Sequence, residues 1–107
     1  AGKWAPVQAS GGSVGAPVAS SGVIASVSGA ASSTTILAAN ASRKGATIYN
    51  DSTAVLYLAL ADTTASTTVY SVQIPAGGYF EVPNRYAGKI VGIWAAANGA
   101  ARVTEHV

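Results

Sequence analysis

The stretch AVLYLALA, residues 54–61, decides the fold because it is apolar on two faces. Alternate side chains of a strand point to opposite faces, so three leucines share one face while Val55, Tyr57 and two alanines share the other. A strand that is apolar on both faces is covered on both faces. We therefore predict a buried strand over residues 54–61, with Val55 and Tyr57 in contact with a second subunit.

Turn residues recur on both sides of this strand at a spacing typical of all-β proteins. Between the turns, short apolar or alternating segments predict further strands. These strands are expected over residues 34–37, 45–50, 68–74, 79–82, 89–97 and 101–107. The expected turns include residues 50–52, 75–78 and 97–99, whose Gly, Asn and Asp residues suit turn geometry. We predict a small antiparallel β-sandwich or barrel over residues 35–107.

The first third of the chain has a different composition. Residues 1–34 are rich in Ala, Gly, Ser and Val, and no charged residue or His occurs from Trp4 to Ser42. Ordering about 30 residues costs on the order of 45 kcal/mol of backbone entropy. That cost requires roughly 1,800 Å² of apolar burial, which obligate interfaces supply. We predict that residues 1–34 form an extended assembly arm along a neighbouring molecule; a flexible linker is the alternative.

The expected contacts of this arm are its larger apolar residues, which are spaced along it. Trp4 is the foremost anchor, because a Trp side chain buries a large area at low entropic cost. The predicted contact residues of the arm are Trp4, Val7, Val14, Val18, Val23, Ile24 and Val27.

Charge is sparse, which excludes several classes of partner. Only 9% of the residues are charged, against about 25% in typical domains. The six basic residues are scattered, whereas nucleic-acid-binding proteins cluster them on one face. No run of about 18 apolar residues occurs, so no segment is expected to span a membrane. We expect neither a nucleic acid nor a membrane as partner.

The sequence contains no recognisable catalytic constellation. His106 is the sole His, and its neighbour Glu105 would point to the opposite face of a strand. Without Cys there is no thiol nucleophile and no Cys-ligated metal. Asp62 and Glu81 are the one carboxylate pair to consider for glycoside hydrolysis, and nothing in the sequence brings them together. We expect no enzymatic activity, no cofactor and no metal.

Aromatic residues of an all-β domain can form a platform for sugars. Trp94 is flanked by apolar residues and is expected in the core. Tyr79 and Tyr86 flank the loop around Pro83 and are the expected surface aromatics. They keep open the alternative of a secreted carbohydrate-binding module, in which residues 1–34 would be a dispensable linker.

Two stretches, SRKGATIYNDSTAVLYLALAD at 42–62 and YSVQIPAGGYFEVPNRYAGKIVGIWAAANGAARVTE at 70–105, resemble small virion structural proteins of tailed bacteriophages. The pattern comprises R-x-G-x-x-I-x-N-D-S, a Leu/Tyr strand, AGGYFEVP, GIW and ARVTE, and the arm carries no mark of it. The resemblance implies a non-enzymatic head decoration or cement protein that binds a capsid surface. Its partners would be the major capsid protein or other virion proteins, and it would form a homo-oligomer, with a trimer favoured. A tail or neck component is the alternative.

Overall fold

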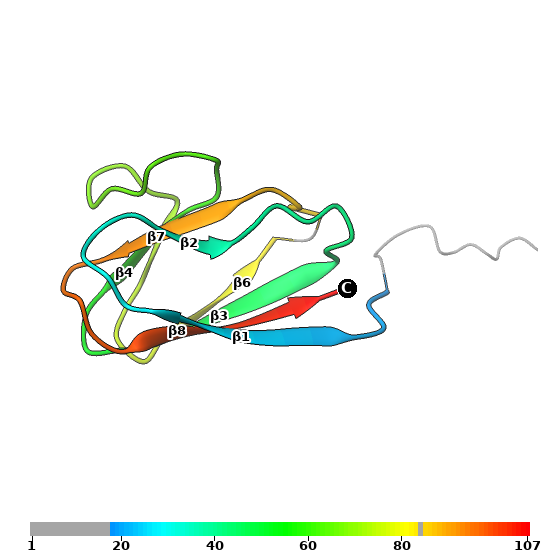
Figure 1. The fold of residues 1–107 in the computed structure, drawn as a ribbon, viewed down its shortest axis with the longest axis horizontal. Helices are drawn as coiled ribbons and strands as arrows, with labels where there is room; N and C mark the ends of the chain where they lie inside the picture. Colours follow the sequence, from blue (N-terminus) through cyan, green and yellow to red (C-terminus); the bar gives the residue numbers. More distant parts are fainter. Residues whose placement is uncertain (1–17, 84) are drawn as a thin grey trace, which may run out of the picture.

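The computed structural model describes residues 18–83 and 85–107, which form two antiparallel sheets packed face to face (Figure 1). Sheet 1 has the strand order β1-β8-β3-β6 and sheet 2 the order β2-β7-β4-β5. The strands are β1 (Gly22–Ser28), β2 (Thr34–Leu37), β3 (Gly45–Asp51), β4 (Leu56–Ala59), β5 (Val72–Ile74), β6 (Tyr79–Val82), β7 (Ile90–Trp94) and β8 (Ala100–His106).

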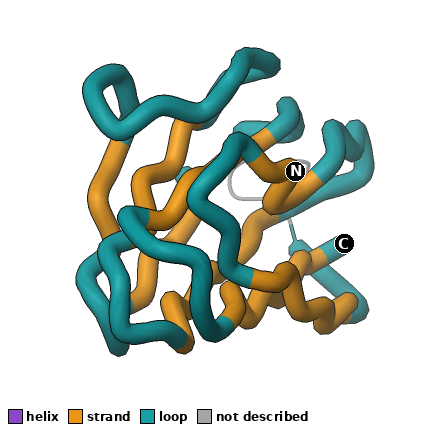
Figure 2. Tube along the Cα trace, turned by 60° about the vertical axis from the view of Figure 1, so that its left-hand side comes forward, coloured by secondary structure: helices purple, strands orange, loops and turns teal. Residues whose placement is uncertain are grey.

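The described residues contain strands and loops and no helix (Figure 2), so the predicted all-β sandwich is confirmed. Accordingly, no helix in this part of the chain is long and apolar enough to cross a membrane. Strands β2, β3 and β6 lie where the sequence predicts them. The predicted strand ends at Asn50, whereas β3 continues to Asp51 and the chain bends only after it.

Three strands are shorter than expected. The strand predicted over residues 54–61 is confined to β4, the one over 68–74 to β5 and the one over 89–97 to β7. The residues between β4 and β5 leave the sheet and fold back over its outer face, where Ala65 packs on Ala59 and Val91. On this face of β4 the sequence predicts contact with a second subunit. At Ala59 the loop of the same chain covers the face instead. Beside it, Tyr57 packs edge-on against Tyr70, with ring centroids 5.1 Å apart.

Part of the segment predicted as an arm belongs to the sandwich itself. β1 pairs with β8 along its whole length, from Gly22 opposite His106 to Ser28 opposite Ala100. The residues just before β1 follow the same course, because the backbone N–H groups of residues 20 and 21 both donate to the Val107 carbonyl. Residues 20–28 are therefore held by their own chain, and the sandwich begins before the boundary expected at residue 35.

The core lies between the two sheets. Leu56 and Leu58 on the leucine face of β4 are fully buried, as the alternation predicts, and Trp94 is buried among them. The largest fully buried apolar side chains are Trp94, Ile48, Leu56, Leu58, Ile74, Ile90 and Val103. Gly92 makes close packing possible here, since a Cβ on it would lie 3.0 Å from both Ile36 and Leu56 side-chain atoms.

A buried amide at the end of β3 holds two neighbouring segments. The Asn50 side chain is fully buried, and its Nδ2 donates to the carbonyl oxygens of Ala54 at 2.8 Å and Ile74 at 2.9 Å. Its Oδ1 accepts a hydrogen bond from the Ser52 hydroxyl at 2.7 Å. Buried polar groups are rarely left without partners, and here one side chain fixes the bend after β3 and the end of β5.

A buried guanidinium organises the other end of the sandwich. Arg43 precedes β3, and its Nε forms an ion pair with Glu105 of β8 at 2.7 Å. Its two terminal nitrogens donate to the carbonyl oxygens of Ala38 at 2.6 Å, Gly88 at 2.8 Å and Tyr86 at 3.1 Å. Arg is suited to this position because its planar group presents five donors in a fixed arrangement.

Candidate ligand-binding face on sheet 1

Several of the residues that carry the sequence resemblance form the framework of the fold. Arg43 and Asn50 are buried polar residues, Trp94 is buried in the core, and Glu105 is paired with Arg43 inside the sandwich. These side chains lie inside the sandwich, so a ligand that approaches from solvent would not contact them. A functional site must therefore be sought among exposed residues.

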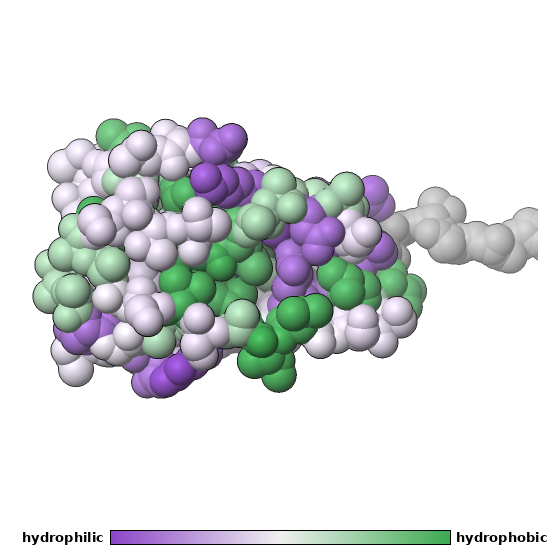
Figure 3. Space-filling view, viewed as in Figure 1, coloured by the Kyte–Doolittle hydropathy of each residue, from purple (hydrophilic) through white to green (hydrophobic). Residues whose placement is uncertain are grey.

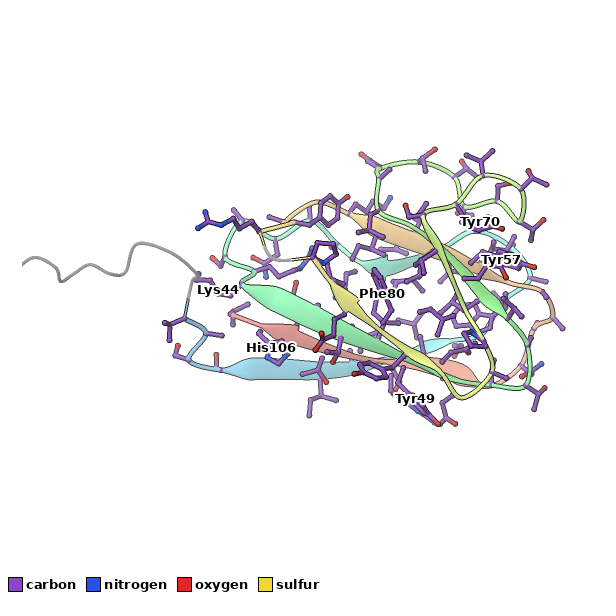
Figure 4. The ribbon with its side chains drawn as sticks, turned by 180° about the vertical axis from the view of Figure 1, so that it is seen from behind. Lys44, Tyr49, Tyr57, Tyr70, Phe80 and His106 are labelled. Carbon is purple, nitrogen blue, oxygen red and sulfur yellow. The ribbon has the colours of Figure 1, made fainter. Side chains whose placement is uncertain are left out.

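The outer face of sheet 1 is the surface where exposed aromatic and polar side chains come together. Ala46, Ile48 and Asn50 of β3 point inward, so the residues between them point outward. Figure 4 shows Tyr49 and His106 on this outer side, whereas Phe80 lies between the sheets. We call this surface the sheet 1 face.

Two tyrosines lie side by side on the sheet 1 face. Tyr49 of β3 is directly opposite Tyr79 of β6 in the strand register. Tyr49 is 43% exposed and Tyr79 is 66% exposed. Side chains directly opposite each other in an antiparallel pair have Cβ atoms about 4.5–5.5 Å apart, so the two residues are cross-strand neighbours, and we call them the tyrosine pair.

A fixed guanidinium flanks this pair. Arg102 of β8 is opposite Tyr49 in the register. Its Nε and Nη2 donate to the Asp51 carboxylate at 3.0 and 2.9 Å, and its Nη1 donates to the Ser26 hydroxyl at 2.9 Å. The row Ser26, Arg102, Tyr49 and Tyr79 thus crosses all four strands of sheet 1.

A shallow hollow adjoins the tyrosine pair. Thr47 and Glu81 are opposite each other one row along from Tyr49 and Tyr79. They line a hollow of about 270 Å³ together with Lys44 and His106. Polar groups that accept and that donate hydrogen bonds therefore meet beside two exposed aromatic rings.

The structure places the titratable residues singled out in the sequence on different faces and elements. His106 lines the hollow while Glu105 points inward to Arg43, so the two neighbours lie on opposite faces, as the alternation predicts. Glu81 lies on sheet 1, whereas Asp62 lies in the loop after β4, where it forms an ion pair with Lys89 at 3.5 Å. Among residues 18–83 and 85–107, no three His, Asp or Glu side chains are grouped to hold a metal ion.

The expected arm contacts fall into three groups. Trp4, Val7 and Val14 lie outside the described residues. Val18, Val23 and Ile24 are exposed, by 85%, 52% and 80% respectively, and we call these three residues and β1 the β1 edge. Val27, in contrast, is half-buried and packs against the core. Apolar side chains reach the surface over β1 and between β1 and β2 (Figure 3).

The remaining predicted residues differ in accessibility. Tyr79 is exposed, as expected for a surface aromatic. Tyr86 is half-buried, packs against the core and donates its hydroxyl to the Lys89 carbonyl at 2.6 Å, so it holds a loop in place. Val55 and Tyr57 are half-buried. Sequence reasoning missed Tyr49 as the partner of Tyr79, although its position next to inward-pointing Ile48 marks it as outward-facing.

Comparison of the chain with protein families, with curated proteins and with solved structures gives no match. The resemblance to phage virion proteins therefore stays a prediction from the sequence, and the functional argument rests on the surfaces described above.

Proposed function

We propose that the protein is a non-enzymatic virion structural protein of the head decoration type, which binds a capsid surface through the β1 edge. One observation carries the proposal: β1 is an uncharged edge strand that exposes Val23 and Ile24. Among the described residues, β1 pairs with β8 alone. Edge strands of soluble proteins are normally protected by charge, proline, bulges or short length. The seven residues of β1 contain neither charge nor proline, and its pairing with β8 has no register shift.

The binding step on this proposal is strand addition. An extended segment of the capsid protein pairs with the free side of β1 by main-chain hydrogen bonds, while its side chains cover Val23 and Ile24. Full burial of one such side chain contributes about 1.5–3 kcal/mol. The mechanism requires no chemistry, and many copies on one particle would reinforce the shell. The phage-type pattern at residues 42–62 and 70–105 supports this class of protein.

The test measures association with particles. The full chain, the double variant Val23→Lys/Ile24→Lys and the control Val69→Lys are incubated with undecorated capsids from the same source and sedimented. Val69 is a matched control because it is also exposed and apolar but lies in the loop between β4 and β5. Val27 is left unchanged because it packs against the core.

The expected result is that wild type and Val69→Lys pellet at hundreds of copies per particle, while the double variant stays in the supernatant. Wild type that never pellets would contradict the decoration function, and equal pelleting of the double variant would contradict the β1 contact. A few copies per particle would point to the tail or neck alternative. The predicted homo-oligomer, with a trimer favoured, is checked by light scattering on the free chain.

A further inference from the structure

We infer that the sheet 1 face binds an uncharged oligosaccharide chain across Tyr49, Tyr79 and the adjoining hollow. The inference goes beyond the proposed attachment to a capsid, because its tyrosines lie on β3 and β6 rather than on β1. It starts from the fact that the tyrosine pair and the polar hollow are adjacent rows of one sheet face.

The tyrosines supply the apolar half of the site. Pyranose rings present patches of C–H groups that pack against the faces of aromatic rings, while their hydroxyls stay available for hydrogen bonds. Tyr49 and Tyr79 are exposed and opposite each other, so they offer two aromatic side chains on neighbouring strands. A Tyr side chain also carries a hydroxyl at its tip, which suits a surface that is apolar at one end and wet at the other.

The hollow supplies the polar half. The Glu81 carboxylate accepts hydrogen bonds, the Lys44 ammonium donates them, and the Thr47 hydroxyl does both. The Lys44 Nζ already donates to the Ser42 carbonyl at 3.1 Å, which fixes its position at the rim. Such a mixture of donors and acceptors matches sugar hydroxyls, each of which both donates and accepts.

The balance of charge favours a neutral ligand. The Arg102 charge is matched by Asp51 at 2.9 Å, and Lys44 and Glu81 carry opposite charges in the same hollow. A site for a nucleic acid or another polyanion would need a surplus of positive charge. A protein partner is less well matched, because interface hot spots lie in well-packed, desolvated pockets, whereas this face is shallow and ringed by charged groups.

The dimensions and position of the site fit a chain-like ligand on an assembled particle. From Tyr79 on β6 across β3 to His106 on β8, the site covers two strand-to-strand spacings, or about 10 Å. A shallow site that runs across strands accommodates an extended oligosaccharide better than a small enclosed molecule. Tyr49 and Tyr79 lie on β3 and β6, separated from β1 by β8, so they stay open when β1 is covered.

The test is affinity electrophoresis of the full chain in native gels that contain one polysaccharide each: mannan, xylan, mixed-linkage β-glucan, dextran or, as a polyanion, alginate. We expect at least one uncharged polysaccharide to retard wild type. Tyr49→Ala and Tyr79→Ala should weaken the apparent affinity about tenfold, the equivalent of 1.4 kcal/mol. Tyr79→Phe should retain it because the ring remains. Tyr70→Ala is the matched control, since Tyr70 is a comparably exposed tyrosine next to sheet 2.

Each other outcome overturns the inference. If wild type migrates equally in all gels, the protein does not bind these glycans. If Tyr79→Ala is retarded as strongly as wild type, the glycan binds elsewhere than at this site. If only alginate retards the protein and salt abolishes this retardation, the interaction is a general attraction between a polyanion and a basic chain. If Tyr79→Ala instead abolishes sedimentation with capsids, the face is a protein contact, and the capsid-binding proposal survives without the glycan. Far-UV circular dichroism of each variant verifies that the sandwich is folded.

Discussion

The indole Nε1 of Trp94 donates a hydrogen bond to the Asn50 Oδ1 at 3.1 Å and thereby joins the two sheets through the core. Asn50 is the last residue but one of β3 in sheet 1, and Trp94 ends β7 of sheet 2. Both side chains are fully buried. The Asn50 Nδ2 also donates to the Ile74 carbonyl of β5 in sheet 2, so this one amide makes two directional contacts between the sheets and helps to set how one lies on the other.

Replacement of this amide by an apolar side chain of similar size should be strongly destabilising. Asn50→Leu removes the side-chain partner of the Trp94 N–H and of the Ile74 carbonyl, while the Ala54 carbonyl keeps its hydrogen bond from the Ser52 hydroxyl. Each buried polar group left unpaired costs about 1–3 kcal/mol, so we expect a loss of about 3 kcal/mol or more. Urea unfolding followed by far-UV circular dichroism measures it. A loss below about 1 kcal/mol would mean that water replaces the amide.

Two arginines of this protein should differ sharply in their contribution to stability. Arg43→Met removes a buried guanidinium and leaves Glu105 without its ion-pair partner inside the sandwich, which should cost about 3–5 kcal/mol. Arg102→Met removes a half-exposed ion pair with Asp51, which should cost less than about 1 kcal/mol. Parallel urea titrations compare the free energies of unfolding of the two variants. Equal losses of stability would contradict the conclusion that the buried Arg43 holds this end of the sandwich together.

Two glycines with positive φ should respond differently to the same substitution. Gly77 has φ of 75°, and a Cβ on it would meet nothing within 4 Å. Gly99 has φ of 60°, and its Cβ would lie 2.6 Å from the Ser52 Cβ. Gly77→Ala should cost only the backbone strain, about 1–2 kcal/mol. Gly99→Ala adds a steric clash and should cost about 3–5 kcal/mol. Thermal unfolding of both variants tests the order, and the reverse order would contradict the turn geometry.

The loop over sheet 2 should detach when its buried contact is made polar. Ala65 is buried against Ala59 and Val91, and its N–H donates to the Ser33 hydroxyl at 2.8 Å. Ala65→Glu should release residues 60–71, because an unpaired charge is not stable in that contact. Limited proteolysis should then cut this loop faster than in wild type. Thr63→Glu, at an exposed position of the same loop, is the control and should leave the cleavage rate unchanged.

The sequence was informative where one face of a strand is apolar and the other polar. In β3, Ile48 points inward and Thr47 outward, and that alternation predicts both the strand and its faces. The leucine face of β4 likewise predicts the core. The cover over its other face could not be predicted, because Ala65 is a small residue in a Thr-rich loop, and such a composition carries no signal of burial.

β1 and the sheet 1 face were harder to predict for a different reason. β1 lies in a segment of Gly, Ser, Ala and Val whose composition is that of a linker, and its pairing with β8 joins residues about 80 positions apart. The tyrosine pair depends on the register of β3 against β6, which places Tyr49 opposite Tyr79. Sequence alternation gives the face of a residue but not its neighbour on the next strand.

The position of β8 inside sheet 1 has a consequence for synthesis on the ribosome. β8 lies between β1 and β3, so the sheet lacks an interior strand until residues 100–106 have emerged. At ~5–20 residues per second, the stretch from the end of β3 to β8 takes roughly 3–10 s to make. During that interval β1 and β3 have no shared neighbour, and the apolar side chains of β1 stay open to other nascent chains. The order of strands in the finished sandwich therefore makes the closure of sheet 1 a late event, which waits for β8.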